Sequence, residues 1–271
     1  MLNFSILTDQ DHRTLSEAFP NIDPSLTLPE IWSLMDAAWV RYGCHLPPLT
    51  NDKLSAFYAD PVWLLYGLFA ESDIETLVHR HKFVEFISNL QLKSALDFGG
   101  GFGGFPRLLA SSNPYIAVDV YEPYPSSSAL QLASQIPNVS FIQEPCQIYD
   151  IVSALDVFEH LVDPIRGLLH VASLVPVGGY LLTANCFSPV IYCHLPSTFH
   201  LRYTFDVFCF LLGFRPSSTI PSTHGRLYRR CFSVSPPLPL FRLLEVCSRC
   251  YFAFRSFYTN QIKVFLVRIF S

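Results

Sequence analysis

Short apolar runs alternate with amphipathic stretches from about residue 94 to the end of the chain. This alternation indicates strands separated by helices, and hence a mainly parallel sheet covered on both faces. Helices are expected over 126–136, 163–174 and 204–213. Strands are expected to end at 97, to cover 115–120, 139–142, 150–156 and 180–185, to begin at 214, and to cover 261–270. The pattern predicts an α/β fold with a mostly parallel, seven-stranded sheet.

Residues 1–93 show helical periodicity instead, and they are expected to form a helical appendage before the sheet domain, 94–271. The run TLPE at 27–30 is a capping box, the signature of a helix start. A second capping box, SDIE at 72–75, opens a helix that is expected to end near Leu90. The many aromatic residues of this appendage either line a substrate lid or pack against the sheet domain.

The segment 221–258 breaks the alternation and is predicted to be an insertion between the last two strands. It contains the linker-like run SVSPPLPLF and then an apolar helix over 241–257, whose three arginines face only one acidic residue, Glu245. A helix of this composition lies in a membrane interface or packs against the edge of the sheet. Because its apolar residues spread around much of the helix, burial in protein is the favoured alternative.

The glycine-rich stretch SALDFGGGFGGFPRLLA at 94–110 carries the strongest functional signal. An apolar run ends in Asp97, five glycines follow at 99, 100, 101, 103 and 104, and Pro106 fits the first turn of a helix. Glycine adopts positive φ at little cost and lets a ligand approach the backbone closely. A strand, a glycine loop and a helix in this order are typical of a nucleotide-like ligand site.

Composition excludes several classes of function. The chain has 271 residues, a net charge of −4 and a pI near 6.1, which argues against nucleic acid as a partner. No apolar run approaches the roughly 18 residues of a membrane span, and the N-terminus lacks the pattern of a signal peptide. The eight cysteines suggest no disulfide framework and Cys247-x-x-Cys250 stands alone, so the reducing cytoplasm is the expected location.

Several ordered motifs resemble the class I S-adenosylmethionine-dependent methyltransferases, the broad group that includes small-molecule O-methyltransferases. The run Asp97-x-Gly99-x-Gly101-x-Gly103 matches the first motif of that family. DVFEHL at 156–161 follows the fourth strand, and VGG at 177–179 precedes the fifth. The resemblance covers about 94–270. It implies a Rossmann-like sheet and S-adenosylmethionine as the cofactor. The implied reaction is methyl transfer by in-line displacement to a small-molecule acceptor, expected at oxygen.

The resemblance also implies which residues hold the cofactor. The loop glycines Gly99, Gly101 and Gly103 would contact it, and Asp97 would orient its amino group. Asp119, at the end of the second strand, would accept the ribose hydroxyls, although Glu122 is an alternative for this role. Asp156 completes the expected cofactor site. One departure is the connection 143–149, which is shorter than in the family and lacks its usual Asp after the third strand.

Histidine is the natural general base near neutral pH for an oxygen acceptor. His160 and His200 are expected at the carboxyl ends of strands or in the loops there, where an open α/β sheet places its ligands, so they are the candidate catalytic residues. A structural role in a loop is the alternative for each. His194 shares the long loop of His200. Neither paired carboxylates nor a His-rich constellation appears, so no metal is expected.

Two other functions remain open from the sequence. Gly99, Gly101 and Gly104 also satisfy G-x-G-x-x-G, and with Asp119 they would suit a nicotinamide-dinucleotide-binding oxidoreductase. A methyltransferase-like binding module without turnover is the other alternative. Asp97 within the glycine motif, Glu159-His160 after the fourth strand and a terminal strand suited to antiparallel insertion favour the methyltransferase.

Overall fold

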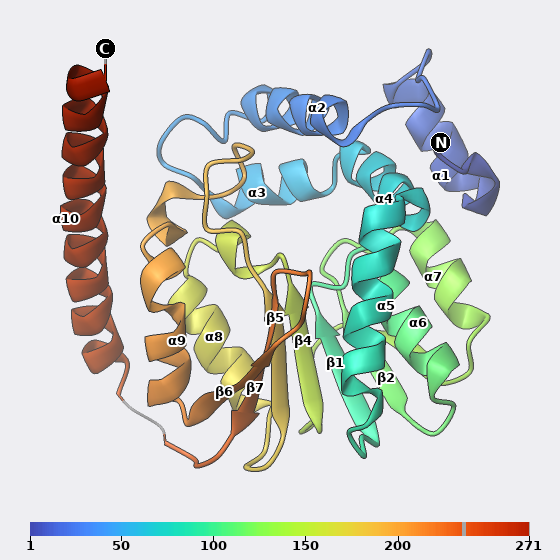
Figure 1. Cartoon of the computed structure of the whole chain (residues 1–271). Helices are drawn as coiled ribbons and strands as arrows, with labels where there is room; N and C mark the ends of the chain where they lie inside the picture. The colour runs from blue at the N-terminus through green and yellow to red at the C-terminus, as the bar shows by residue number, and fades with distance from the viewer. Residues whose placement is uncertain (235–236, 271) are drawn as a thin grey trace.

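The computed structural model describes residues 1–234 and 237–270, with the side chains of the last helix described as far as Phe257. Its centre is a seven-stranded sheet in the order β3-β2-β1-β4-β5-β7-β6, in which β7 alone runs antiparallel to its neighbours (Figure 1). The strands are β1 (Ser94–Phe98), β2 (Ala117–Tyr121), β3 (Val139–Ile142), β4 (Ile151–Leu155), β5 (Tyr180–Ala184), β6 (Phe214–Thr219) and β7 (Gly225–Arg230). This arrangement confirms the predicted Rossmann-like α/β fold.

Helices cover both faces of the sheet because strand residues alternate between two apolar cores. Leu96 and Phe98 face one core, which α8 (Pro164–Ser173) and α9 (Leu201–Leu211) complete. Ala95 faces the other core, to which α5 (Ile74–Ser88), α6 (Gly104–Ser112) and α7 (Ser127–Ser134) contribute. Val120 and Ile151 of the neighbouring strands share this second core, so the inner strands are buried on both sides.

The N-terminal helices form a third apolar core at the carboxyl ends of the strands (Figure 1). They are α1 (Asp9–Ala18), α2 (Leu28–Arg41), α3 (Asn51–Tyr58) and α4 (Val62–Ser72), preceded by a 3-10 turn at Phe4–Ile6. Phe102 of the glycine loop belongs to this core, and a Cβ on Gly67 of α4 would lie only 2.5 Å from its ring. The loop therefore packs directly onto the backbone of α4.

The observed helix starts agree in part with those predicted from the sequence. The capping box at Thr27 is present, and the Thr27 amide donates to Glu30 Oε2 at 2.8 Å. The second predicted box is wrong in detail, because Asp73 rather than Ser72 caps α5 by accepting from the Thr76 amide at 2.8 Å. Thr204 lies inside α9 instead of starting it.

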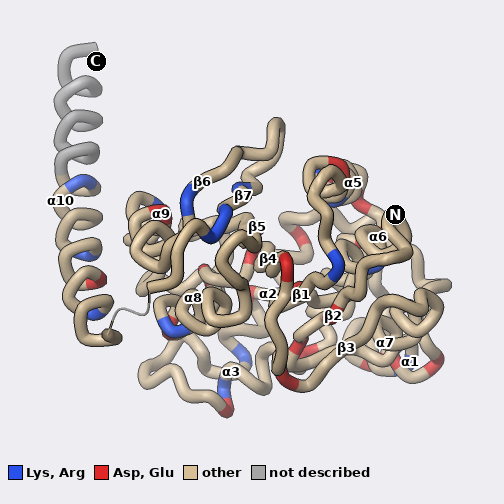
Figure 2. Tube along the Cα trace, turned by 90° about the horizontal axis from the view of Figure 1, so that it is seen from below, with Lys and Arg blue, Asp and Glu red and all other residues tan. Residues whose placement is uncertain are grey.

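The final strand expected at 261–270 is wrong, and so is the insertion placed before it. The seventh strand is β7, which lies inside 221–258 and forms a hairpin with β6, while the chain from Leu238 to Phe270 forms helix α10. The three arginines along β7 hide the apolar signal of a strand (Figure 2). The Arg226 guanidinium pairs with Asp206 of α9, a contact that only the tertiary structure reveals.

Helix α10 lies beside α9 and not at the edge of the sheet (Figures 1 and 2). Phe241 is fully buried and its ring lies 5.9 Å from that of Phe208, and Ser248 bonds with Thr204 at 2.5 Å between hydroxyl oxygens. The opposite face is apolar and exposed, with Leu243 at 61% and Phe257 at 64%. Among the described residues, no helix is both long and apolar enough for a membrane span.

Candidate cofactor and acceptor site

The glycine loop after β1 adopts the backbone geometry that its sequence predicts. Gly99, Gly101 and Gly103 have φ of +77°, +53° and +76°, which side-chain-bearing residues rarely adopt. A Cβ on Gly101 would meet no atom within 4 Å, so the backbone there borders open space. The loop thus offers the uncovered backbone that a ligand can approach closely.

Asp97 lies at the base of this loop and is almost completely buried. Its Oδ1 accepts a hydrogen bond from the Ser153 hydroxyl at 2.6 Å, and a Cβ on Gly100 would lie 2.8 Å from Oδ2. Burial raises the pKa of the Asp97 carboxyl to about 6, which the Ser153 hydrogen bond only partly offsets. A buried carboxylate of this kind gains stability from a cationic ligand.

The two acidic candidates around β2 have different surroundings. Asp119 lies within β2, where its Oδ2 accepts from the Tyr149 hydroxyl at 2.8 Å and from the Gln147 amide at 2.9 Å. Glu122 follows β2, and its Oε2 accepts from the Gly101 amide at 2.9 Å. Burial raises the pKa of the Glu122 carboxyl. Glu122 therefore contacts the glycine loop. The side-chain hydrogen bonds of Asp119 instead go to the connection between β3 and β4.

Asp156 comes directly after β4 and takes an unusual backbone conformation, with φ of 53°. Its amide donates to the Ala184 carbonyl at 2.7 Å, and its Oδ1 lies 3.1 Å from His224 Nε2. That contact raises the pKa of His224. Non-glycine residues with positive φ cluster at functional sites, so we include this turn in the candidate site at the carboxyl ends of β1 and β4.

The two predicted catalytic histidines lie in different places. His160 follows β4, and its Nδ1 lies 3.1 Å from the Cys193 carbonyl. Burial lowers its pKa to about 4, so the ring is neutral at pH 7. His200 is the N-cap residue of α9, is 2% exposed, and its Nδ1 lies 2.7 Å from the Ser248 hydroxyl of α10. The structure thus gives His200 the contacts of a packing residue, and its catalytic role stays an untested prediction.

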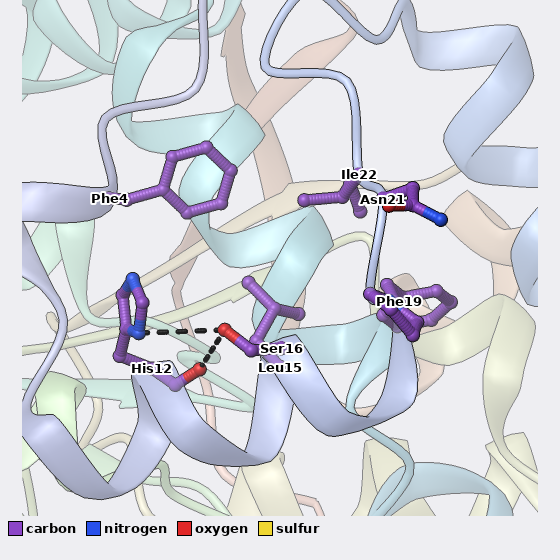
Figure 3. Close-up of a pocket in the computed structure, with 8 residues that line it drawn as sticks. Phe4, His12, Leu15, Ser16, Phe19, Asn21 and Ile22 are labelled. Carbon is purple, nitrogen blue, oxygen red and sulfur yellow. Dashed lines mark hydrogen bonds between the residues drawn. The ribbon is translucent and has the colours of Figure 1, made fainter.

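A cavity of about 380 Å³ lies between α3 and the turn after β4. Tyr58 and Tyr124 border it on one side and His160 and Leu161 on another. The cavity lies where the N-terminal appendage meets a loop at the carboxyl edge of the sheet, and we therefore take it as the candidate acceptor pocket. A smaller cavity of about 190 Å³ beside α1, lined by Phe4 and His12 among others, includes none of the predicted site residues (Figure 3).

Two groups near the site were not predicted as site residues. Arg80 of α5 lies against the glycine loop, since a Cβ on Gly104 would collide with its guanidinium. Glu71 holds this cation, with Arg80 Nη1 at 3.0 Å from Oε1 and Arg107 Nη2 at 2.5 Å from Oε2. Glu159, inside the DVFEHL motif, is fully buried, and burial together with the charge of Asp156 raises its pKa well above the usual range. The motif itself was a signal for Glu159, but no local pattern identifies Arg80.

A parallel sheet with a glycine loop after β1, acidic groups at the carboxyl edge and an antiparallel β7 defines the class of α/β enzymes that bind a nucleoside cofactor. The chain belongs to the methyltransferase-domain family, whose model matches residues 69–204, half of the chain. This match confirms the resemblance to the class I S-adenosylmethionine-dependent methyltransferases seen in the sequence.

Two known proteins show how far the likeness extends. The ubiquinone biosynthesis O-methyltransferase of Coxiella burnetii is 26% identical over 110 residues, which cover 38% of this chain and 47% of that protein. The chain thus matches about half the length of its curated relatives. An O-methyltransferase family protein from Burkholderia thailandensis has a TM-score of 0.50 at 14% identity, covering 80% of this chain and 76% of that chain. At this identity the likeness concerns the fold alone.

The residues present fit S-adenosylmethionine, the cofactor of this class. The open space at Gly101 lets the ligand approach the backbone of the loop closely. Asp97 is a buried acid that a cationic amino group would stabilise, and the Glu122 carboxylate beside the loop suits ribose hydroxyls.

Proposed function

We propose that this protein transfers a methyl group from S-adenosylmethionine to a hydroxyl oxygen of a small-molecule acceptor. The observation that carries the proposal is the cavity of about 380 Å³ between Tyr58, Tyr124 and His160. Aromatic and apolar side chains with a few polar groups are the usual lining of a small-molecule pocket. The names of the relatives and structural neighbours, several of them O-methyltransferases, support oxygen as the acceptor atom.

Each cofactor residue has a proposed role. Asp97 holds the amino group, Glu122 accepts the ribose hydroxyls, and the backbone of Gly101 lies against the ligand. Asp156 fixes the turn after β4 through its bond with the Ala184 carbonyl. Asp119, expected to bind the ribose, is proposed instead to hold the β3–β4 connection through Tyr149, because both of its recorded side-chain bonds go there.

The bound cofactor supplies a methyl group on a sulfonium, which is already activated. The protein's task is to align the acceptor oxygen with that methyl group and to exclude water. Tyr58 and Tyr124 would hold an apolar acceptor ring in the cavity. His160 borders the same space, but a pKa of about 4 makes it a weak base for an alcohol or phenol.

The test is a screen of phenolic and aliphatic hydroxyl compounds with the purified chain and labelled cofactor. We expect release of S-adenosylhomocysteine and a product whose new methyl group lies on oxygen by mass spectrometry and NMR. Methylation at nitrogen or carbon would refute the acceptor class. Cofactor binding without any turnover across the panel would favour the binding module, and tight NADH binding would favour the oxidoreductase.

A second proposal concerns partners. The outer face of α10 between 241 and 257 is proposed to contact a membrane surface, and its exposed apolar residues, among them Leu243 and Phe257, support this. The wild type should sediment with anionic liposomes at low salt. Replacing Leu243 and Phe257 by serine should release it, whereas Val207→Ser, an exposed apolar position on α9, should not. A wild type that stays in the supernatant contradicts the proposal.

A further inference from the structure

Three side chains with lone pairs meet beside the acceptor cavity. One oxygen of Glu159 and one ring nitrogen each of His160 and His194 lie within 4.8 Å of one another. The two rings are 4.9 Å apart between centroids and nearly perpendicular. Glu159 and His160 follow β4, while His194 comes from the loop after β5, so the fold brings the group together.

The hydrogen bonds of the two histidines leave the same nitrogen available on each. His160 Nδ1 lies 3.1 Å from the Cys193 carbonyl, and His194 Nδ1 lies 2.9 Å from the Ser188 carbonyl. A carbonyl only accepts, so each Nδ1 carries the hydrogen and each Nε2 keeps its lone pair. A backbone carbonyl on the far nitrogen is the usual support of a metal-binding histidine, because it fixes both the tautomer and the ring orientation.

Glu159 independently points to a ligand shared by these groups. Its side chain is fully buried, and Oε1 accepts from the Cys186 amide at 2.6 Å. Oε2 is also buried, yet it has no hydrogen-bond partner among the described residues. An unpartnered buried carboxylate oxygen is costly, and two imidazole lone pairs nearby offer it no hydrogen. A cation shared by the three groups removes this cost, as does a proton on Oε2 that the cation would displace.

We propose that Glu159, His160 and His194 bind a divalent transition-metal ion of the zinc type. Two imidazoles and one carboxylate form a ligand set of catalytic zinc sites, which keep a further position open. Ligand atoms around such an ion are roughly 3.3 Å apart for bonds of about 2.0–2.1 Å. The separations here, up to 4.8 Å, need only small side-chain rotations to close. The proposal reverses the expectation, drawn from the sequence, that no metal is involved.

The site's position suggests its use, and this step rests on the proposed function. His160 also lines the acceptor cavity, so the open position of the ion would be reached from there. A divalent ion lowers the pKa of an oxygen that binds to it. The acceptor hydroxyl would lose its proton to water, and the oxygen would form its bond to the methyl carbon as the carbon–sulfur bond breaks. The ion would thus supply the activation that His160 cannot provide as a base.

Metal content tests the binding site without any activity measurement. The full chain is freed of metal with a chelator, dialysed against ZnCl₂ and analysed by mass spectrometry for zinc per protein. We expect one tightly held zinc per chain. Glu159→Gln and His194→Gln should each weaken zinc binding on the order of 100-fold or more, since even outer partners of metal ligands affect affinity by 10- to 100-fold. His12→Gln, an exposed histidine on α1, should bind zinc like the wild type.

Two further measurements keep the test decisive. Cofactor affinity by calorimetry shows that each variant is folded, and Co²⁺ in place of zinc should give visible absorption bands in the wild type and lose them in both variants. Zinc well below one equivalent in the wild type, or equal zinc in the wild type and both folded variants, would overturn the proposed site. Zinc binding by the trio together with unchanged methyl transfer after metal removal would overturn its role in activation. A protein that binds zinc but methylates no hydroxyl would instead refute the proposed function and leave the site intact.

Discussion

Substitution of Gly101 is the sharpest test of the proposed cofactor site. The stability lost by placing a side chain on its positive-φ backbone can be measured separately from the loss of space for the ligand. The Gly101 φ of +53° is a conformation that a side-chain-bearing residue adopts at a cost of roughly 1–2 kcal/mol. A Cβ there would meet no protein atom within 4 Å, so the cofactor-free chain has room for a side chain to begin at this position. In Gly101→Val, the valine would occupy the space in which the cofactor is expected to lie against the loop.

The chain provides a matched control for the backbone cost. Gly178 has φ of +93° and also has no atom within 4 Å of an added Cβ, but it precedes β5 at the opposite end of the sheet. Gly178→Val should therefore lose as much stability as Gly101→Val or more, since its φ lies further from the left-handed region open to other residues. Only the variant at Gly101 should lose the cofactor.

Calorimetric titration with S-adenosylmethionine is the assay, with thermal unfolding of the cofactor-free proteins beside it. We expect Gly101→Val to weaken binding at least 100-fold, which corresponds to about 2.7 kcal/mol, and Gly178→Val to bind within about threefold of the wild type. Normal cofactor affinity in Gly101→Val would refute the assignment of the loop. Equal losses in both variants would show that stability, and not the ligand space, governs binding.

Three other outcomes follow from contacts described above. Glu122→Gln should weaken cofactor binding 10- to 100-fold by removing a charged hydrogen-bond acceptor, whereas Asp119→Asn should change it by less than about threefold; the reverse order in calorimetry would restore Asp119 as the ribose ligand. Asp97 keeps its proton in the folded state up to a pKa of about 6, against 3.8 for the ordinary group, so the folded state binds more protons between these values and its stability falls as pH rises through this window. Relative to Asp97→Asn, the cofactor-free wild type should lose about 2 kcal/mol between pH 4 and pH 7 in denaturant unfolding, and a constant difference would contradict the raised pKa. Glu71→Ala should lower the unfolding free energy by about 3 kcal/mol by leaving two nearly buried arginines without their carboxylate, and an unchanged melting temperature would show that solvent already screens them.

The features that the sequence predicted correctly are those with local causes. The glycine loop is recognisable because the run from Asp97 to Gly103 encodes a strand end and positive φ within a few residues. The strand at Val139–Ile142 has the predicted bounds. Strand β7 was missed because its arginines depend on distant partners: Arg230 donates to the Ala172 and Val175 carbonyls at 2.5 Å. Such compensation of charge is invisible in a hydropathy pattern.

Residues of the candidate site could be predicted from the sequence only where they lie together in one segment of the chain. The choice between Asp119 and Glu122 depends on how far β2 extends past the loop, which the pairing of Phe98 with Tyr121 determines. The trio of Glu159, His160 and His194 depends on the path of the loop after β5, where the His194 ring bonds to the Ser188 carbonyl. Neither the strand register nor the loop path can be read from residue spacing.

The contact between Phe102 and Gly67 joins the cofactor loop to the N-terminal helices. The ring occupies the space that a larger residue at Gly67 would fill, so the loop and α4 are in direct contact. A ligand that orders the glycine loop is therefore expected to order the N-terminal helices as well. The loop and these helices then share the free-energy cost of that ordering. We therefore expect the proposed cofactor and acceptor sites to be thermodynamically linked through the N-terminal helices, so that an acceptor bound in the cavity strengthens cofactor binding and the cofactor strengthens acceptor binding to the same degree.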